Sequence, residues 1–147
     1  MIDQKYYEYF DNSLNSASKY KKNYFLKRKT QLLKNVSSEV QTYENKTRFS
    51  IDRKWFYELA FLTQIPTEKK TYCCEHGKIL YSTVCEWIKN NPELTINILE
   101  TGTARGFSSL CMAKALSDYK KEGKIISIDI LPNEKPIYWN CVTDIKG

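Results

Sequence analysis

The chain has 147 residues, a length typical of one domain with a helical extension. Hydrophobic residues make up 41% and charged residues 27% of it, and glycine and proline are scarce, which excludes a linker or a disordered tail. No stretch approaches the roughly 18 apolar residues of a membrane span, and the polar first residues do not form an export signal. We therefore expect a cytoplasmic protein with no membrane partner.

The formal net charge of +6 is concentrated in the N-terminal part. Residues 1–60 hold 12 Lys and Arg against 7 Asp and Glu, whereas residues 61–147 hold 11 against 10. A basic region of this kind can bind nucleic acid, an anionic membrane or an acidic partner. Because no nucleic-acid fold signature accompanies it, we expect a solvated helix face and no nucleic-acid partner.

The chain has five cysteines, an odd count. Cys85, Cys111 and Cys141 lie within apolar patterns, which is typical of buried, reduced thiols. The other two open the segment Cys73-Cys74-Glu75-His76. Adjacent cysteines lack the two-residue gap that lets both thiolates reach one tetrahedral ion, so we expect no metal site.

Residues 1–92 predict a mainly helical N-terminal region, which starts with a polar, aperiodic lead at 1–18. Residues 19–45 predict one amphipathic helix, because Leu26, Leu33 and Val40 recur every seventh residue. With so few heptads, we expect this helix to pack on its own domain and not to form a coiled coil.

Two further helices are predicted before residue 92. Asp52 can cap a helix that runs through Leu62 and ends before Pro66. After a loop at 66–77, a second helix is expected from about Lys78 to Asn90. Its apolar face is formed by Ile79, Leu80, Val84, Trp87 and Ile88.

The hydrophobic period changes at residue 93, where a second region, 93–147, begins. The predicted elements are a strand at Thr95–Leu99, a turn at Glu100–Gly106, a helix at Phe107–Tyr119 ended by Gly123, and a strand at Lys124–Asp129. The second strand is apolar enough to be buried on both faces. Strand, turn, helix and strand form a βαβ unit, so the predicted fold class is α/β.

The residues at the carboxyl ends of both predicted strands suit a nucleotide cofactor. Gly102 allows a tight turn and lets the backbone approach a ligand, while Gly106 lets the helix start close to the sheet. The first helix amides are unpaired donors. Asp129 ends the neighbouring strand, where a carboxylate can accept hydrogen bonds from ribose hydroxyls.

Glu100 discriminates between cofactors, because it stands two residues before the first glycine. Its carboxylate would repel a pyrophosphate and attract a sulfonium or ammonium group, by about 3 kcal/mol at roughly 5 Å and an effective dielectric constant of about 20. The glycine spacing, G-x-x-x-G with Ala104 in the middle, also departs from the dinucleotide fingerprint. Both observations favour S-adenosylmethionine over NAD.

Two segments carry a resemblance to a known family: Glu-Thr-Gly-Thr-Ala-Arg-Gly-Phe-Ser-Ser-Leu at 100–110 and Ile-Ser-Ile-Asp at 126–129. They resemble the cofactor motifs of class I methyltransferases, closest to small-molecule and sugar O-methyltransferase-like members. The resemblance covers 95–130. It implies a Rossmann-like parallel sheet, S-adenosyl-L-methionine as cofactor and a small-molecule or glycan methyl acceptor. The cofactor-binding residues that it implies are Glu100, Thr101, Gly102, Thr103, Ala104, Gly106, Phe107, Ser108, Asp129 and Ile130.

Within that set, the resemblance gives different roles to different residues. Glu100, Gly102 and Gly106 would line the methionine end of the cofactor, Asp129 would bind the ribose, and Ile130 would contact the adenine. Arg105 either faces solvent or contacts an acidic substrate.

The family's sheet needs several strands beyond Asp129, but only 18 residues follow it. A two-stranded parallel sheet would expose both of its edges. We therefore expect the first half of such an enzyme with its sheet truncated, either in an oligomer or with a complementing C-terminal half. No general base can be named.

Two alternatives remain open at this point. One is an NAD- or nucleotide-binding oxidoreductase fragment, which Glu100 and the absence of a middle glycine disfavour. The other is a non-catalytic module whose basic N-terminal helices bind a partner. Clustering of its lysines and arginines on one exposed face would support the module.

Overall fold

The computed structural model describes residues 22–34, 36–65, 73–131, 137, 139 and 141–144. In chain order its elements are α2 (Lys22–Lys34), α3 (Ser38–Thr47), α4 (Arg53–Thr63), α5 (His76–Asn90), β1 (Ile96–Thr101), α6 (Phe107–Asp118), β2 (Gly123–Ile128) and the short 3-10 helix η1 (Val142–Asp144). The described residues thus form an α/β structure, as the sequence predicts. The predictions for 1–18 and for Pro66 lie outside them.

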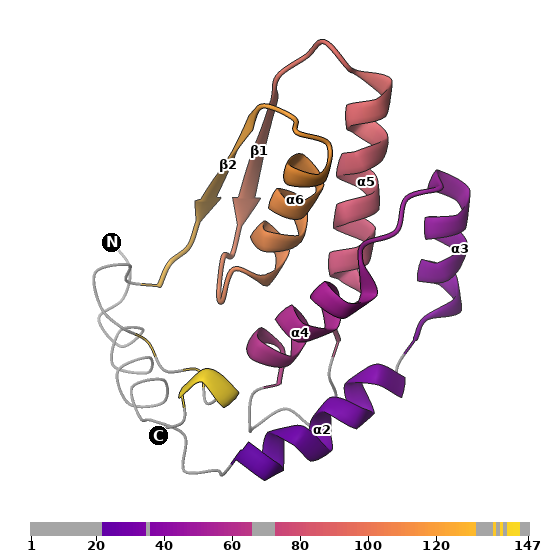
Figure 1. Ribbon diagram of the computed structural model, residues 1–147. Helices are drawn as coiled ribbons and strands as arrows, with labels where there is room; N and C mark the ends of the chain where they lie inside the picture. The colour runs from indigo at the N-terminus through magenta and orange to yellow at the C-terminus, as the bar shows by residue number, and fades with distance from the viewer. Residues whose placement is uncertain are drawn as a thin grey trace.

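The two strands form a parallel sheet, and α6 connects them. The register pairs Ile98 with Ile125 and Glu100 with Ser127, so these four side chains share the face that lies toward α6. Figure 1 shows the sheet, α6, α5 and α3 arranged in succession, with α4 and α2 toward the lower end.

The core lies between the sheet and the helices, and α5 and α6 approach each other closely within it. A Cβ atom added at Gly77 on α5 would lie 2.7 Å from the Phe107 ring and 2.8 Å from Cys111 Sγ on α6. Glycine at this position is therefore required by packing. The Phe107 ring also meets Phe56 of α4 edge to face, with 5.7 Å between centroids.

The prediction of one helix over 19–45 is wrong, because the chain forms α2 and α3 instead. Ser37 caps α3: its hydroxyl accepts a hydrogen bond from the Val40 amide at 3.2 Å, which favours a new helix start. The leucines that recur every seventh residue do not form the packing face of α2 either. Leu26 and Leu33 are each 42% exposed, and Phe25 and Leu32 are buried in their place.

The end of α6 also differs from the prediction. Gly123 does not terminate the helix but is the first residue of β2, and Lys120 takes the left-handed conformation after the helix, at φ +48°. A Cβ atom at Gly123 would lie 2.6 Å from the Ile96 carbonyl oxygen, so close strand approach is what requires glycine there. The expectation that this strand is buried on both faces is wrong too, since Ile126 and Ile128 are more than half exposed.

Other local predictions are confirmed. Asp52 caps α4, accepting a hydrogen bond from the Trp55 amide at 2.8 Å. Cys85, Cys111 and Cys141 are buried, and Cys85 and Cys111 are free thiols. None of the helices in the described ranges is long and apolar enough to cross a membrane.

Candidate functional site

The loop between β1 and α6 has an unusual backbone, because alternate residues take positive φ angles. These are Gly102 at +83°, Ala104 at +46° and Gly106 at +74°. A Cβ atom added at either glycine would meet nothing within 4 Å, so both glycines border open space. The loop therefore needs glycine for its conformation, and it leaves room beside the backbone for another molecule.

Hydrogen bonds hold this loop against the carboxyl ends of both strands. The Gly102 amide donates to the Ile128 carbonyl at 2.8 Å, which continues the parallel ladder beyond Thr101. Asp129 accepts hydrogen bonds from the Ala104 amide at 2.7 Å and the Leu131 amide at 2.9 Å. The structure thus brings Asp129 and the glycine loop together, and each Asp129 oxygen retains a second lone-pair direction for a ligand.

Glu100 is buried at the end of β1, with 9% of its surface exposed. Its Oε2 atom accepts hydrogen bonds from the hydroxyls of Ser109 and Ser127. Its Oε1 atom is buried and has no hydrogen-bond partner among the described residues. A carboxylate oxygen in that state is costly unless a donor or a cation reaches it.

The two serines were missed by the sequence analysis, although the sequence holds a signal for one of them. Ser127 lies directly beside Glu100 in the parallel register, which the predicted strand pairing would place on the same face. Ser109 lies on the first turn of α6, and which of its side chains would face the sheet could not be read from the sequence.

The predicted cofactor-binding residues fall into two groups in the structure. Most of them are at least partly exposed around the β1–α6 loop. Thr101, Gly102, Ala104 and Ile130 are exposed, and Thr103, Gly106, Ser108 and Asp129 are half-buried. Phe107 differs, because its side chain is 3% exposed and packs 5.1 Å from His76, ring to ring. Only the backbone of Phe107 is available to the loop.

Arg105 makes contacts within the chain that the sequence analysis did not predict. Its guanidinium donates to the Leu62 carbonyl at the end of α4, at 3.3 Å, and to the Thr143 hydroxyl of η1, at 2.5 Å. Arg105 therefore anchors the loop to two segments that are remote in the sequence.

A second cluster of polar side chains is buried at the start of α5. Lys78 Nζ lies 2.8 Å from Glu75 Oε1 and donates to the Tyr57 hydroxyl at 3.4 Å. Burial alone would lower the pKa of Lys78, but the hydrogen bond and the charge of Glu75 outweigh burial and raise it. Because the two charges neutralise each other, we assign this cluster to the packing of α4 against α5.

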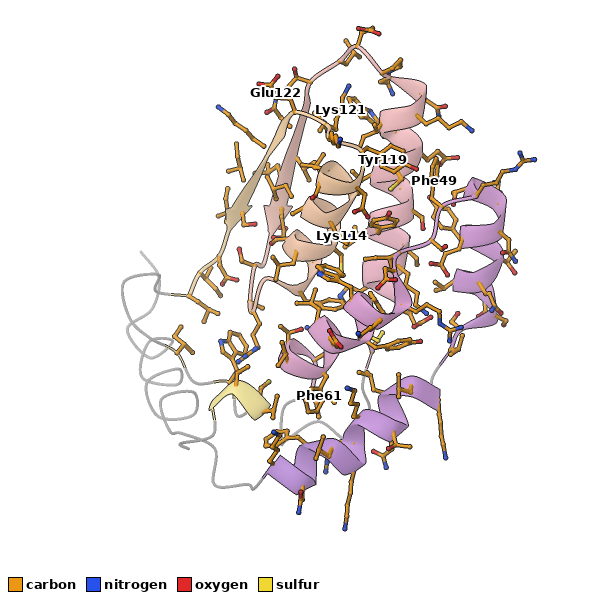
Figure 2. All side chains as sticks on the ribbon, in the orientation of Figure 1. Phe49, Phe61, Lys114, Tyr119, Lys121 and Glu122 are labelled. Atoms are coloured by element: carbon orange, nitrogen blue, oxygen red, sulfur yellow. The ribbon has the colours of Figure 1, made fainter. Side chains whose placement is uncertain are left out.

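A hollow of about 470 Å³ lies at the opposite end of the sheet, where Figure 2 labels Tyr119, Lys121 and Glu122. Lys121 donates there to the Pro92 carbonyl, so the lysine ties two connecting segments together. This hollow does not touch the glycine loop. Within the described ranges, no group of three or more His, Cys, Asp and Glu side chains is placed to hold a metal ion.

No family model matches this chain. No curated protein and no solved structure is significantly similar to it.

Proposed function

We propose that the chain binds S-adenosylmethionine at the β1–α6 loop and takes part in methyl transfer to a small molecule or sugar, either as an enzyme or as the cofactor-binding fragment of one. In this proposal β1, α6 and β2 are the first βαβ unit of a Rossmann-like sheet. The bound cofactor would supply an electrophilic methyl group on a sulfonium. The chain's own residues would bind and orient it.

The buried Oε1 atom of Glu100 carries the proposal. Two serine hydroxyls saturate the other oxygen, which fixes the carboxylate in place. The remaining oxygen suits a cationic or hydrogen-donating group. A pyrophosphate is neither cationic nor a hydrogen-bond donor. S-adenosylmethionine has two cationic groups, an ammonium and a sulfonium, and its ammonium also donates hydrogen bonds.

Three further features of the loop fit the same ligand. The open space beside Gly102 and Gly106 lets a ligand approach the backbone closely. The first turn of α6 offers amide donors to a carboxylate. Asp129 stands at the end of β2 with acceptor capacity for ribose hydroxyls, beyond the two amides that it already binds.

Calorimetric titration of S-adenosylmethionine, S-adenosylhomocysteine and NAD tests the proposal. We expect both adenosyl ligands to bind and NAD not to bind. Glu100→Gln keeps the shape of the side chain and removes its charge, so it should weaken S-adenosylmethionine more than S-adenosylhomocysteine, which lacks the sulfonium charge. An attraction of about 3 kcal/mol sets an upper limit of roughly a hundredfold on that difference.

Glu122→Gln is the matched control, because Glu122 is exposed at the other end of the sheet and should leave both affinities unchanged. Asp129→Ala should weaken both adenosyl ligands equally, since both carry the ribose. Preferential binding of NAD would support the nucleotide-binding alternative. Loss of binding without a difference between the two adenosyl ligands in Glu100→Gln would refute the role of the carboxylate.

A further inference from the structure

α2 is strongly basic and lies at the periphery of the molecule. Its 13 residues include five Lys and Arg and no Asp or Glu. Figure 1 shows α2 at the lower end, with α4 between it and α6. One side of the helix is thus available for contact with something outside the described chain.

The inner side of α2 is well defined. Phe25 and Leu32 are fully buried on it. Lys29 Nζ lies 4.9 Å from the ring centroid of Phe61, which Figure 2 shows between α4 and α2. These contacts fix which way the helix faces.

The outer side combines apolar and positive side chains. Leu26 and Leu33 are each 42% exposed, and their spacing of seven residues places them on one stripe of the helix. Lys27 and Lys34 directly follow the two leucines, about 100° further around the helix, and both are exposed. Lys22, also exposed, lies one turn before Leu26. We call these five residues, Lys22, Leu26, Lys27, Leu33 and Lys34, the outer α2 face.

We propose that the outer α2 face binds the surface of an anionic lipid bilayer, with its leucines at the level of the headgroups and its lysines on lipid phosphates. The charge is complementary to such a surface, because the helix carries no acidic side chain. Lysine side chains can cover apolar surface with their carbon stems while their ammonium groups reach the headgroups.

The exposed leucines favour a bilayer over nucleic acid. A phosphate backbone would pair with the lysines but would give the aliphatic stripe no partner. The sequence analysis expected no membrane partner because no stretch is long enough to span a bilayer. Lying on the surface needs only one helix face, and the exposure of Leu26 and Leu33 was not visible in the sequence.

Co-sedimentation with vesicles tests the proposal. One set consists of phosphatidylcholine alone and the other contains about one third phosphatidylglycerol, each at about 50 mM and about 500 mM NaCl. We expect binding to the anionic vesicles only, reduced at least about tenfold at the higher salt concentration. The double variant Leu26→Gln/Leu33→Gln and the triple variant Lys22→Gln/Lys27→Gln/Lys34→Gln should each lose most of the binding.

Matched controls carry the same substitutions elsewhere. Leu110→Gln replaces a leucine of similar exposure, 44%, on α6. Lys46→Gln/Lys54→Gln/Lys124→Gln removes three exposed charges from α3, α4 and β2. Both controls should bind like the unchanged protein, and circular dichroism checks that every variant is folded.

Three outcomes would overturn the proposal. They are no binding to anionic vesicles, equal binding to both vesicle types, and unchanged binding in the leucine variant. Salt-sensitive binding to duplex RNA that the leucine variant retains, together with absence of vesicle binding, would assign the basic face to nucleic acid.

Discussion

The two faces of the β1–β2 sheet differ in a way that composition alone does not suggest. One face carries Ile98, Ile125 and the buried Glu100, and it lies toward α6. The other carries Leu99, Ile126 and Ile128, which are 66%, 54% and 56% exposed. The covered face thus holds a carboxylate, while the open face exposes three large aliphatic side chains beside Asn97, Thr101 and Lys124.

Burial at this sheet therefore does not follow hydrophobicity alone. A carboxylate beneath a helix is unfavourable unless its hydrogen bonds are made, and the two serines make only part of them. Three aliphatic side chains in water are equally atypical of a sheet face. Three measurements test this contrast between the two faces.

The largest effect is expected on the covered side, at Phe107. Phe107→Ala removes a ring that is 3% exposed and contacts Phe56, so it should lower the free energy of unfolding by about 3–5 kcal/mol. Urea denaturation measures the loss. Leu110→Ala on the exposed side of α6 is the control and should cost less than about 1 kcal/mol. Similar costs for the two variants would mean that α6 does not pack as described.

A pH effect is expected from the thiols buried among the helices of the covered side. Burial raises the pKa of Cys85 to about 11 and the pKa values of Cys74 and Cys111 to about 12, from an ordinary value of 9.0. Their contribution to stability is therefore fully present below pH 9 and is lost as the pH rises toward 11 and 12. Each thiol steepens the decline by up to about 1.4 kcal/mol per pH unit.

Urea denaturation between pH 7 and pH 11 measures this decline. Cys111→Ala should make it shallower, whereas Cys73→Ala removes an exposed thiol and should leave the slope unchanged. A stability that stays flat above pH 9 would show that these thiols reach solvent in the folded protein.

The smallest effect is expected on the open face. Ile126→Thr changes a side chain that is 54% exposed, so the free energy of unfolding should stay within about 0.5 kcal/mol of its original value. Ile125→Thr, one residue earlier and packed against the core, should cost about 1–2 kcal/mol. If the two substitutions cost the same, the open face is covered in solution.

Local signals in the sequence predicted much of this structure. The change of period near residue 93, the Asp52 cap and the two glycines of the turn led to β1, α4 and the loop close to their observed places. The sequence predicted the register of the two paired strands less directly. The contact of Ser127 with Glu100 depends on the alignment of two strands, which a single strand's pattern does not determine.

Tertiary contacts account for the predictions that were wrong. Residues 26 and 33 keep a helical spacing, but whether a neighbour covers them depends on where α4 lies against α2. Phe25 and Leu32, on the adjoining side of the helix, are buried in the core instead. Gly123 looked like a helix terminator because glycine commonly is one. Its actual constraint, the carbonyl of Ile96, comes from the neighbouring strand.

The anchoring of Arg105 has a consequence for how related sequences should vary. Arg105 uses the main-chain carbonyl of residue 62 but the side-chain hydroxyl of Thr143. The side chain at position 62 is therefore free to drift, whereas position 143 must keep a hydroxyl as long as position 105 is arginine. In related sequences we therefore expect correlated substitutions at positions 105 and 143, and no correlation between positions 105 and 62.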